Sequence, residues 1–484
     1  MLALLIPLAI LTPRSGHDGA LARLEMKPVE VTIPGGETKT AYRGTLRVPI
    51  VRADPESKEI GIDVWRFPAE SDAPEGRLPI FELHGGPGWA GYEPHSINWA
   101  NDIARHVAQT DLVVVGQRGI GTSEPNTTCG GFARPIDPDL DPDDFAKAVQ
   151  AQCAACRDHW EGEGFDLSGF NVIEAAGDIE DVRRLLGYEK IVLLGGSFGS
   201  HWGMTVLRYH PDIVARAVLH GMEGPDHTYD SPSGVLAALQ SIAAQAEASP
   251  ELADRLPEEG LIEALRFVIQ SIDEGPFEVE VDGELVPITA QGLRGVALGY
   301  THSVRSRRSV GGWPADVMKL YEGEFDAAAR AIGEERARVG LPTASFFQLD
   351  CGSGISASRL TRYLEDPAIE IVGNLSRFYE SACSAWNADL GDDFRGDFTT
   401  DVPTMIVHGT WDVSTPFSNA LELVPCFKNL HFVPVEGGTH GALGEAARYD
   451  RAFEKALIAF LSEGQTDGIP ESVELPPIRW NTDW

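Results

Sequence analysis

The sequence contains short runs of large apolar residues that end in glycine: RLPIFELHGG, TDLVVVGQRG and KIVLLGG. Runs of this kind, without alternating polar residues, are typical of strands that are covered on both faces. Stretches with helical periodicity lie between them, among them DDFAKAVQAQCAACRDHW and VIEAAGDIEDVRRLLGY. Repeated strand, helix and strand patterns predict an α/β fold with a doubly wound, mostly parallel sheet.

The order of these patterns divides the chain into segments. Three alternating stretches near the start, VEVTIPGG, YRGTLRVPIV and EIGIDVWRF, predict antiparallel strands. Strand patterns stop after IVARAVLHG and return with VPTMIVHG and LHFVPVEGG, followed by one predicted closing helix through AARYDRAFEKALIAFLSEG. The stretch between them is mostly amphipathic helix, for example LADRLPEEGLIEALRFVIQSI, with one predicted hairpin, FEVEVDGELVPIT. We expect a first core segment over 23–221, a helical cap over 222–400, a second core segment over 401–465 and an extended surface tail over 466–484.

The net charge of the chain limits its binding partners, and its N-terminal residues indicate where the protein is located. The formal net charge of −34 argues against nucleic acid, because phosphate binding needs a basic surface. An apolar run followed by Ala20, Leu21 and Ala22 predicts a signal peptide over 1–22 and an extracytoplasmic protein, periplasmic or secreted. No Lys or Arg precedes the run, and a buried or frayed N-terminal segment is the alternative. The run is shorter than the roughly 20 residues of a spanning helix, so we expect no stable membrane anchor.

Six cysteines raise the question of disulfides, which export would permit. We expect Cys351 to pair with Cys383 within the cap, and Cys129 to pair with Cys153 or Cys156. The CAAC motif also suits a redox or zinc pair, but no second CxxC or paired histidine follows it. We therefore expect no metal, and the lack of a dinucleotide fingerprint leads us to expect no cofactor.

The turn IVLLGGSFG places Ser197 between a predicted buried strand and a predicted helix. This context suits the GxSxG nucleophile elbow, although a tight turn without chemistry would use the same glycines. A serine nucleophile needs a histidine base and an acid that orients it, in the chain order Ser, Asp or Glu, His. Asp412 follows TMIVHG and His440 follows HFVPVEGG, so both lie at predicted strand ends in the required order.

Other residues fit these roles less well. Asp401 lies before its strand and Glu436 is too near His440 in sequence, while His408 lies inside a strand and is expected to pack in the core. Acyl transfer also needs amide donors for the oxyanion. The glycines of LHGGPGW follow a predicted strand, so we expect the N–H of Gly86 or a neighbour to form the oxyanion hole with the N–H of Phe198.

The motifs HGGPG, QRGIGTSEP, GGSFG, GTWDVSTP and GGTH occur in this order around the helical insertion. In these motifs the chain resembles the prolyl aminopeptidase and tripeptidyl aminopeptidase branch of the α/β-hydrolases, over roughly 29–464. The resemblance implies an α/β-hydrolase with an inserted helical cap, with Ser197 as nucleophile, His440 as base and Asp412 as orienting acid. In one departure, the family usually has Asp where this chain has Gly116, which leaves the support of the oxyanion loop undetermined.

The resemblance also implies a site for the substrate N-terminus, since members of this branch hold the ammonium with cap carboxylates. Glu223 and Asp226 lie where the predicted cap begins, and we expect Glu223 first and Asp226 second to take this role. A solvated acid is the alternative for each, in a chain with 73 acidic residues. Trp89 and Phe198 are candidates for an apolar pocket beside the nucleophile, with core packing as the alternative.

These features predict a serine aminopeptidase that releases proline or short peptides from free N-termini. The same triad would serve an esterase or another small-molecule hydrolase, because fold does not fix substrate. A binding protein without catalysis is the alternative from a different class. The sequence leaves open the preferred first residue, the number of residues released and the oligomeric state.

Overall fold

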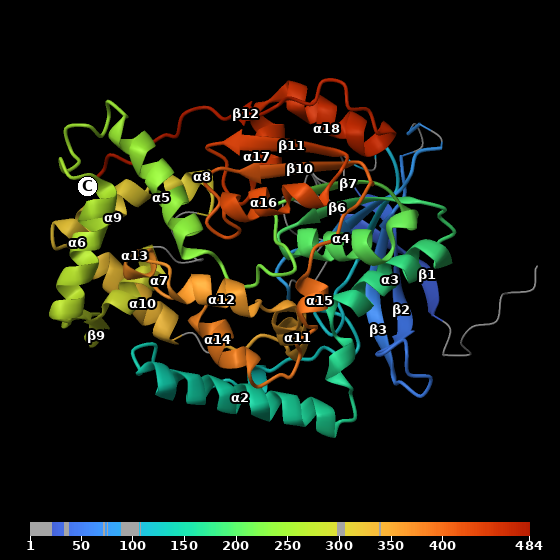
Figure 1. The fold of residues 1–484 in the computed structure, drawn as a ribbon, viewed down its shortest axis with the longest axis horizontal. Helices are drawn as coiled ribbons and strands as arrows, with labels where there is room; N and C mark the ends of the chain where they lie inside the picture. Colours follow the sequence, from blue (N-terminus) through green and yellow to red (C-terminus); the bar gives the residue numbers. More distant parts are fainter. Residues whose placement is uncertain are drawn as a thin grey trace, which may run out of the picture.

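A ten-stranded sheet runs through the centre of the protein, with the strand order β1-β2-β3-β5-β4-β6-β7-β10-β11-β12 (Figure 1). Its strands are β1 (Arg23–Thr32), β2 (Thr38–Pro49), β3 (Glu59–Phe67), β4 (Ile80–Leu83), β5 (Leu112–Val115), β6 (Ile191–Gly196), β7 (Val214–His220), β10 (Thr404–Gly409), β11 (Leu430–Glu436) and β12 (Val473–Glu474). The computed structural model describes residues 22–32, 38–70, 73–74, 76–88, 106, 108–297, 305–337 and 340–484.

The pairing of the strands confirms the predicted antiparallel strands at the start of the chain and the parallel strands after them. β1, β2, β3 and β5 pair antiparallel in succession, and every pair from β5 through β4 and β6 to β12 is parallel. All residues of β5 and β10 are buried, which explains why these runs show no polar alternation. The predicted doubly wound, mostly parallel α/β sheet is therefore confirmed.

Helices cover both faces of the sheet. Ile191 and Leu193 of β6 belong to one apolar cluster with α3 (Val172–Leu185), α4 (Phe198–Tyr209) and α16 (Phe417–Leu423). Val192 and Leu194 point to the opposite face and join a second cluster with α17 (Ala442–Tyr449) and α18 (Arg451–Glu463). The sequence pattern predicts one closing helix where the structure has α17 and α18. The cause is Asp450. Its extended backbone ends the first helix, and its side chain begins α18 by accepting hydrogen bonds from the N–H groups of Ala452 and Phe453.

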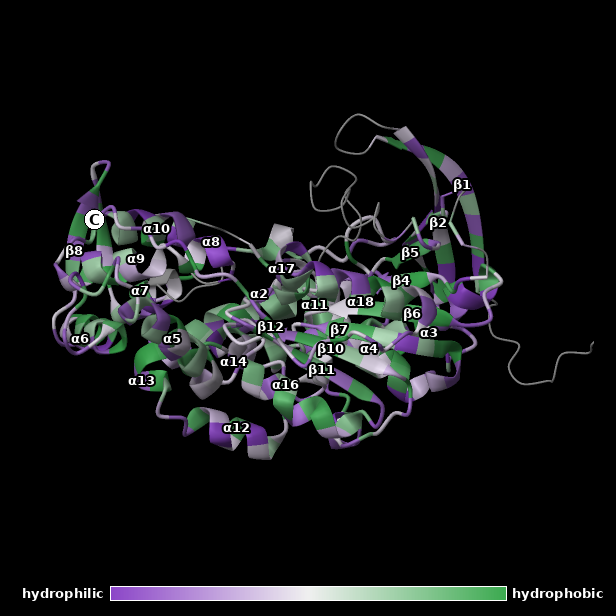
Figure 2. Cartoon of the chain, turned by 90° about the horizontal axis from the view of Figure 1, so that it is seen from above, coloured by the Kyte–Doolittle hydropathy of each residue, from purple (hydrophilic) through white to green (hydrophobic). Residues whose placement is uncertain are grey.

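Between β7 and β10 the chain forms the helical insertion that the sequence predicts, seen at the left and lower centre of Figure 1 and at the left of Figure 2. Its elements are α5 (Pro232–Glu247), α6 (Leu261–Glu274), β8 (Phe277–Val281), β9 (Glu284–Ile288), α7 (Ala290–Ala297), α8 (Arg307–Val310), α9 (Trp313–Tyr321), α10 (Asp326–Ala337), α11 (Ala344–Ser353), α12 (Ala357–Leu364), α13 (Ile369–Val372), α14 (Arg377–Cys383) and α15 (Asp392–Arg395). We refer to this insertion as the cap.

Two local predictions within the cap have different outcomes. The hairpin is confirmed: β8 and β9 pair antiparallel around Asp282 and Gly283, both with positive φ, as a tight Asp-Gly turn requires. The helix predicted over LADRLPEEGLIEALRFVIQSI is wrong in its first half. Gly260 has a φ of 88° and stands as the residue before α6, so the regular helix begins only at Leu261.

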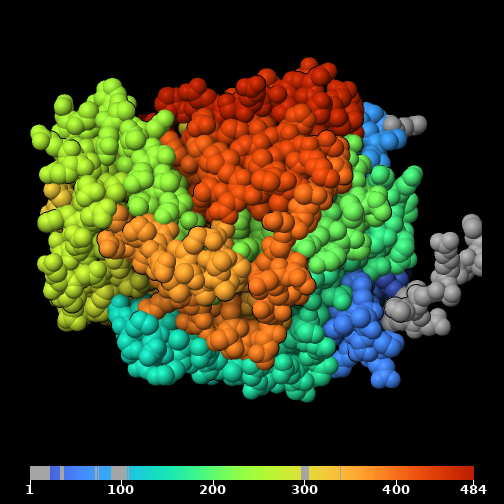
Figure 3. Space-filling model, in the orientation of Figure 1, coloured from blue at the N-terminus to red at the C-terminus, as the bar shows by residue number. Residues whose placement is uncertain are grey.

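Helix α2 (Pro142–Gly162) belongs to the first half of the sequence but packs against the cap. It lies along α14, and Figure 3 shows its surface bordering the cap along the lower edge of the molecule. Arg377 of α14 donates hydrogen bonds to the carbonyls of Pro138 (2.8 Å) and Leu140 (2.7 Å), just before α2. The cap is therefore held by contacts on this side as well as by its two chain connections.

Two disulfides stabilise this region, and both agree with the predicted pairs. Cys351 of α11 is bonded to Cys383 of α14 within the cap. Cys129 is bonded to Cys156 of α2, which decides between the two partners that the sequence left open. Cys153 and Cys426 are free thiols.

The C-terminal tail connects the core to the cap. After β12, which pairs with β11, the chain buries Ile478 and Trp480 against apolar residues of the cap. The N–H of Asn481 donates a hydrogen bond to the carbonyl of Gly311, 2.8 Å away, at the end of α8.

In the part of the chain that the structure describes, no helix has both the length and the apolar character to span a bilayer. The predicted signal peptide lies outside the described residues except for Ala22.

We predict that alkylation of denatured, unreduced protein modifies Cys153 and Cys426 and leaves the other four cysteines protected. In native protein at pH 8, Cys153 should stay unmodified, because burial raises the pKa of its thiol to about 11. Peptide mapping with a second reagent after reduction identifies the protected residues. Alkylation of Cys156 in place of Cys153 would show that Cys129 pairs with the other cysteine of the CAAC motif.

Candidate active site

Ser197 lies at the sharp turn between β6 and α4. Its backbone has φ 56° and ψ −132°, a conformation that costs a non-glycine residue about 1 to 3 kcal/mol. The Ser197 N–H donates to the carbonyl of His220 on β7 at 3.0 Å, and the Ser197 carbonyl accepts from the Ser200 hydroxyl at 2.7 Å. A strained serine between a strand and a helix is the geometry of a nucleophile elbow.

The glycines on either side of Ser197 are required by close backbone contacts. A Cβ atom on Gly195 would lie 2.3 Å from the Gly199 carbonyl oxygen, and one on Gly199 would lie 2.0 Å from the carbonyl oxygen of Leu83. No side chain fits at such distances. The GxSxG pattern therefore has a steric cause here, because the start of α4 packs directly on the end of β4.

Asp412 and His440 meet at the ends of β10 and β11. The His440 Nδ1 lies 2.9 Å and 3.1 Å from the two carboxylate oxygens of Asp412, which is fully buried. Asp412 also accepts hydrogen bonds from the Ser414 N–H, the Thr415 N–H and the Thr415 hydroxyl. Burial alone would raise the pKa of Asp412, but His440, His408 and the Thr415 N–H hold it well below the usual range. The ionised acid fixes the His440 tautomer that carries its proton on Nδ1.

Gly221, which follows β7, separates the histidine from the serine. A Cβ atom built there would lie 3.1 Å from the His440 Cε1 and 3.5 Å from the Ser197 nitrogen. Both residues therefore border the same small space. Within the described residues the Ser197 hydroxyl has no hydrogen-bond partner, and hydrogen bonds of this type are often long until substrate binds. The structure thus brings together the three residues that the sequence selects.

The pKa values of three neighbouring histidines distinguish His440 from His220 and His408. Burial lowers the pKa of His408, and burial together with the nearby imidazoles lowers the pKa of His220 to about 4. Burial also acts to lower the pKa of His440, but the Asp412 carboxylate raises it above its ordinary value. Of these three histidines, only His440 gains basicity from its surroundings.

His408 supports the site from within the core, as the sequence leads us to expect. It is fully buried, its Nδ1 accepts from the Met222 N–H at 3.0 Å, and its Nε2 donates to the Thr415 carbonyl at 2.8 Å. It therefore connects β10 to the start of the cap and to the turn that holds Asp412.

The segment 84–88 after β4 lies against the nucleophile. A Cβ atom on Gly85 would be 2.9 Å from the Ser197 Cβ. The N–H of Phe198 is the first of α4, and the first amides of a helix have no partner within the helix. Among the described residues neither this N–H nor that of Gly86 has a hydrogen-bond partner, so both remain candidates for the oxyanion hole.

The two aromatic residues expected near the nucleophile have different outcomes. The Phe198 ring is buried in the core, with its centroid 5.6 Å from that of His201, so core packing describes it and a pocket wall does not. Trp89 lies outside the described residues.

Three carboxyl groups gather where the cap meets the elbow, and the sequence singled out only Glu223. The Glu223 N–H donates to the Ser200 hydroxyl at 2.9 Å, the same hydroxyl that bonds to the Ser197 carbonyl. Burial raises the pKa of Glu223 well above its usual range, and Asp350 and Asp230 raise it further. We name these three residues, Glu223, Asp230 and Asp350, the carboxyl cluster.

Sequence reasoning missed two members, Asp230 and Asp350. Asp350 is 3% exposed on α11, and burial raises its pKa to about 8, with Asp230 adding to the shift while a hydrogen bond from the Tyr379 hydroxyl at 2.6 Å opposes it. A signal was present, because a single acid stands among apolar residues in the stretch FFQLDCG.

Aromatic rings join the carboxyl cluster to the segment 84–88. Tyr379 stacks on Tyr229 and on Phe346, with ring centroids 6.1 Å apart in both pairs. A Cβ atom on Gly88 would lie 3.2 Å from the Phe346 ring, so this ring of the cap touches the segment beside Ser197. These aromatic contacts thus connect Tyr379, the hydroxyl partner of Asp350, to the segment beside Ser197.

Asp226, the second acid expected at the ammonium site, has a structural partner instead. Its carboxylate accepts hydrogen bonds from the N–H and the hydroxyl of Ser356, which begins α12. Asp350 and Asp230, and not Asp226, are the carboxyl groups whose charges act on Glu223.

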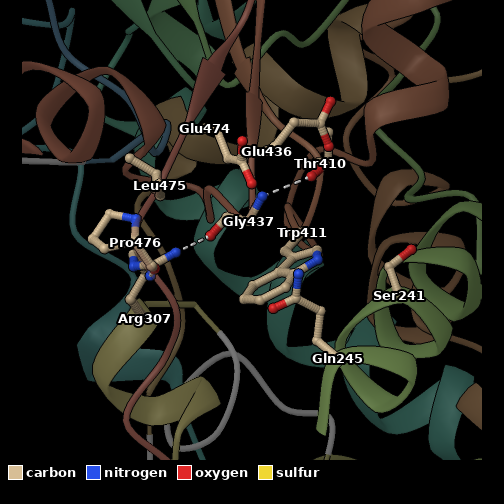
Figure 4. Close-up of a pocket in the computed structure, with 10 residues that line it drawn as sticks. All are labelled: Ser241, Gln245, Arg307, Thr410, Trp411, Glu436, Gly437, Glu474, Leu475 and Pro476. Atoms are coloured by element: carbon tan, nitrogen blue, oxygen red, sulfur yellow. Dashed lines mark hydrogen bonds between the residues drawn. The ribbon is translucent and has the colours of Figure 1, made fainter. Parts of the chain in front are cut away.

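A separate cavity of about 230 Å³ lies between α5, α8, the tail and the ends of β10 and β11 (Figure 4). Arg307 donates to the carbonyl of Gly437 at 2.6 Å, and the Gly437 N–H donates to the Thr410 hydroxyl at 3.1 Å. Ser197 and His440 do not line this cavity, although Trp411 and Gly437, from the loops that carry Asp412 and His440, do. In the described residues no group of three or more His, Cys, Asp and Glu side chains is arranged to hold a metal ion.

Comparison with known proteins agrees with this architecture. A family model described as alpha/beta hydrolase fold matches residues 79–256, and one described as TAP-like protein matches residues 372–472. The chain has the α/β-hydrolase fold. Among solved structures, an esterase from Exiguobacterium antarcticum matches 90% of this chain and 99% of its own, at 14% identity and a TM-score of 0.36.

Three curated relatives of this α/β-hydrolase are peptidases by name. The chain is 28% identical to serine protease Hip1 of Mycobacterium tuberculosis over 205 residues, which cover 41% of this chain and 38% of that protein. It is 30% identical to proline iminopeptidase of Neisseria gonorrhoeae over 154 residues, 32% of this chain and 35% of that one. It is 28% identical to tripeptidyl aminopeptidase of Streptomyces lividans over 204 residues, which cover 38% of this chain and 35% of that protein. The chain thus matches less than two fifths of the length of each relative.

We predict that kcat/KM for a non-ionising ester such as p-nitrophenyl acetate falls at low pH, with a midpoint above the ordinary histidine pKa of about 6.5. The base must be neutral to accept a proton, and the Asp412 carboxylate raises the pKa of His440. In Asp412→Asn this stabilisation of the cation is lost, so the midpoint should move to lower pH and kcat should fall by about 10⁴.

Asp401→Asn is the matched control, because Asp401 is an exposed acid just before β10. It should leave both the rate and the midpoint unchanged. A wild-type midpoint at or below 6.5, or one that Asp412→Asn does not move, would contradict the assignment of His440 as the base.

Proposed function

We propose that the protein is a serine aminopeptidase that cleaves peptides near a free N-terminus through an acyl-enzyme on Ser197. The observation that carries the proposal is the carboxyl cluster beside the nucleophile elbow, because a serine esterase has no need for a group of acids there. The names of the three relatives support the same class of reaction.

In the proposed mechanism the Ser197 hydroxyl attacks the scissile carbonyl while the His440 Nε2 takes its proton. Asp412 keeps the imidazole oriented and stabilises the cation that forms. The N–H groups of Phe198 and Gly86 bind the oxyanion of the tetrahedral intermediate. His440 then gives the proton to the leaving amine, and water enters by the same steps in reverse order to release the acyl group.

The carboxyl cluster would bind the substrate ammonium. Ser200 supports this, since its hydroxyl links the backbone of Glu223 to that of Ser197 and so fixes the acid relative to the nucleophile. Asp230 supports it as well, because its charge raises the pKa of Glu223, Asp350 and His440 alike. An ammonium held by these groups would lie near the reacting carbonyl, as the N-terminus of a substrate of an exopeptidase must.

We also propose that the protein acts outside the cytoplasm, where the predicted signal peptide over 1–22 would send it. The Cys129–Cys156 and Cys351–Cys383 disulfides support this location, because such bonds persist in oxidising compartments.

We predict that a prolyl or alanyl anilide with a free amine is hydrolysed faster than its N-acetylated twin by about 30-fold to several thousand-fold, with Ser197→Ala as the blank. This range corresponds to the roughly 2 to 5 kcal/mol expected for an ion pair with a buried acid. Glu223→Gln and Asp350→Asn should each reduce the ratio of the two rates. Asp226→Asn should preserve it, because that carboxylate is bonded to Ser356.

The other functions have distinct outcomes in this experiment. Equal rates for the two anilides, or activity confined to simple esters, would favour the esterase. A folded protein whose Ser197 is not labelled by a fluorophosphonate would favour a binding protein without catalysis.

We predict that a free dipeptide releases protons when it binds to Ser197→Ala at pH 7. Because the pKa of Asp350 is about 8, the free protein keeps a proton on this carboxyl group at pH 7, and the raised pKa of Glu223 acts in the same direction. An ammonium favours the ionised carboxylates, so binding expels protons, and affinity should rise with pH until the α-amino group titrates at about 7.7 to 8.0.

Calorimetry in buffers of different ionisation enthalpy measures this release. The N-acetylated dipeptide is the control and should release none. Proton uptake by the free dipeptide would contradict the assignment of the carboxyl cluster as the ammonium site.

A further inference from the structure

Gln117 makes three hydrogen bonds to the segment 84–88. It follows β5 directly after Gly116 and is 3% exposed. Its amide nitrogen donates to the carbonyls of His84 and Gly85, each at 3.1 Å, and its amide oxygen accepts from the Gly88 N–H at 2.8 Å. The amide nitrogen and the amide oxygen of this buried side chain therefore bind only the segment 84–88, at residues before and after Gly86.

We propose that Gln117 is a positioning residue that sets the direction of the Gly86 N–H. The Gly85–Gly86 peptide is a planar trans unit, in which the carbonyl of one residue and the N–H of the next point in opposite directions. A hydrogen bond that turns the Gly85 carbonyl toward Gln117 thus turns the Gly86 N–H to the opposite side. This inference rests on the proposed acyl transfer, in which that N–H binds the oxyanion.

The segment needs such a support because its own backbone does not define its shape. Gly86 and Gly88 have φ values of 114° and 101°, and glycine reaches many conformations at similar free energy. The Gln117 carboxamide selects one of them. A donor that is already aligned requires no rearrangement when the oxyanion forms, which is the condition for strong stabilisation of the transition state.

Gln117 is in turn held by the core. Its carbonyl accepts from the Ser123 hydroxyl at 2.8 Å, and the Gly116 N–H before it donates to the carbonyl of Asp63 on β3 at 2.8 Å. The next residue, Arg118, is fully buried and donates to both oxygens of Asp178 at 2.7 Å and 2.8 Å. The segment 84–88 is thus supported from the core without a side chain at position 116.

The test compares Gln117→Ala and Gln117→Asn with wild type on the free-amine anilide. We expect kcat to fall by about 10- to 1000-fold, since the loss of one oxyanion donor typically costs 10²- to 10³-fold. The rate at which a fluorophosphonate labels Ser197 should fall in parallel. KM should change by less than about threefold and the free-amine to N-acetyl ratio should stay the same, because the carboxyl cluster is untouched.

Gln117→Glu is a second variant with a sharper expectation. It keeps an oxygen for the Gly88 N–H but places an oxygen where the amide faced the carbonyls of His84 and Gly85, so kcat should fall at least as far as in Gln117→Ala. Gln152→Ala is the matched control. The Gln152 carboxamide also binds backbone in a loop, since it accepts from the Arg134 N–H and donates to the Arg134 carbonyl. It should leave every rate unchanged. Circular dichroism establishes that each variant is folded, and any folded Gln117 variant decides the question.

The outcomes separate this proposal from the proposed function. If wild-type Ser197 is not labelled, acyl transfer fails and the role of Gln117 fails with it. If wild type is labelled and the folded Gln117 variants react at the wild-type rate, only the role of Gln117 is overturned. Loss of activity through KM, or a changed free-amine to N-acetyl ratio, would also overturn it, because the defect would then lie in substrate binding.

Discussion

The close packing of backbone on backbone around Ser197 is the constraint on which the rest of the site depends. Since Gly199 lies against the carbonyl of Leu83, the start of α4 rests on the end of β4, and the segment 84–88 must leave that strand beside the serine. The Ser197 N–H donates a hydrogen bond to the carbonyl of His220, so the end of β7 also lies beside the serine. The positions of Ser197, of the segment 84–88 and of the start of the cap thus follow from the register of the three neighbouring strands β4, β6 and β7.

The cap has its own internal constraint. The Cys351–Cys383 disulfide joins α11 to α14, and these helices carry Asp350 and its hydroxyl partner Tyr379. The carboxyl group at residue 350 is adjacent in sequence to one half-cystine. The disulfide therefore stabilises the part of the cap where a buried acid must be held, and where burial alone raises the free energy of the ionised carboxylate.

Sequence reasoning succeeded where a pattern has a local cause. Buried runs without polar residues predicted the parallel strands, and the glycines around Ser197 predicted the elbow because no Cβ fits there. It failed where the cause lies in another segment. Asp350 joins Glu223 only because α11 packs over the core, and Gln117 reaches the segment 84–88 only because β5 and β4 are neighbours in the sheet. The one-helix prediction for the C-terminal region failed because periodicity continues across Asp450 although the hydrogen bonds do not.

Chemistry and recognition are supported by different parts of the molecule. The core holds Gln117 through the buried Arg118 and Asp178, whereas the cap supplies Asp350 and the aromatic rings around it. Asp230 and Asp350 raise the pKa of Glu223, and Asp230 also raises that of Asp350, so a bound cation would relieve the repulsion among these groups. A neutral or acylated N-terminus brings no such relief. In the proposed function, the same repulsion would therefore give selectivity for a free N-terminus, and it would act without any change in the triad.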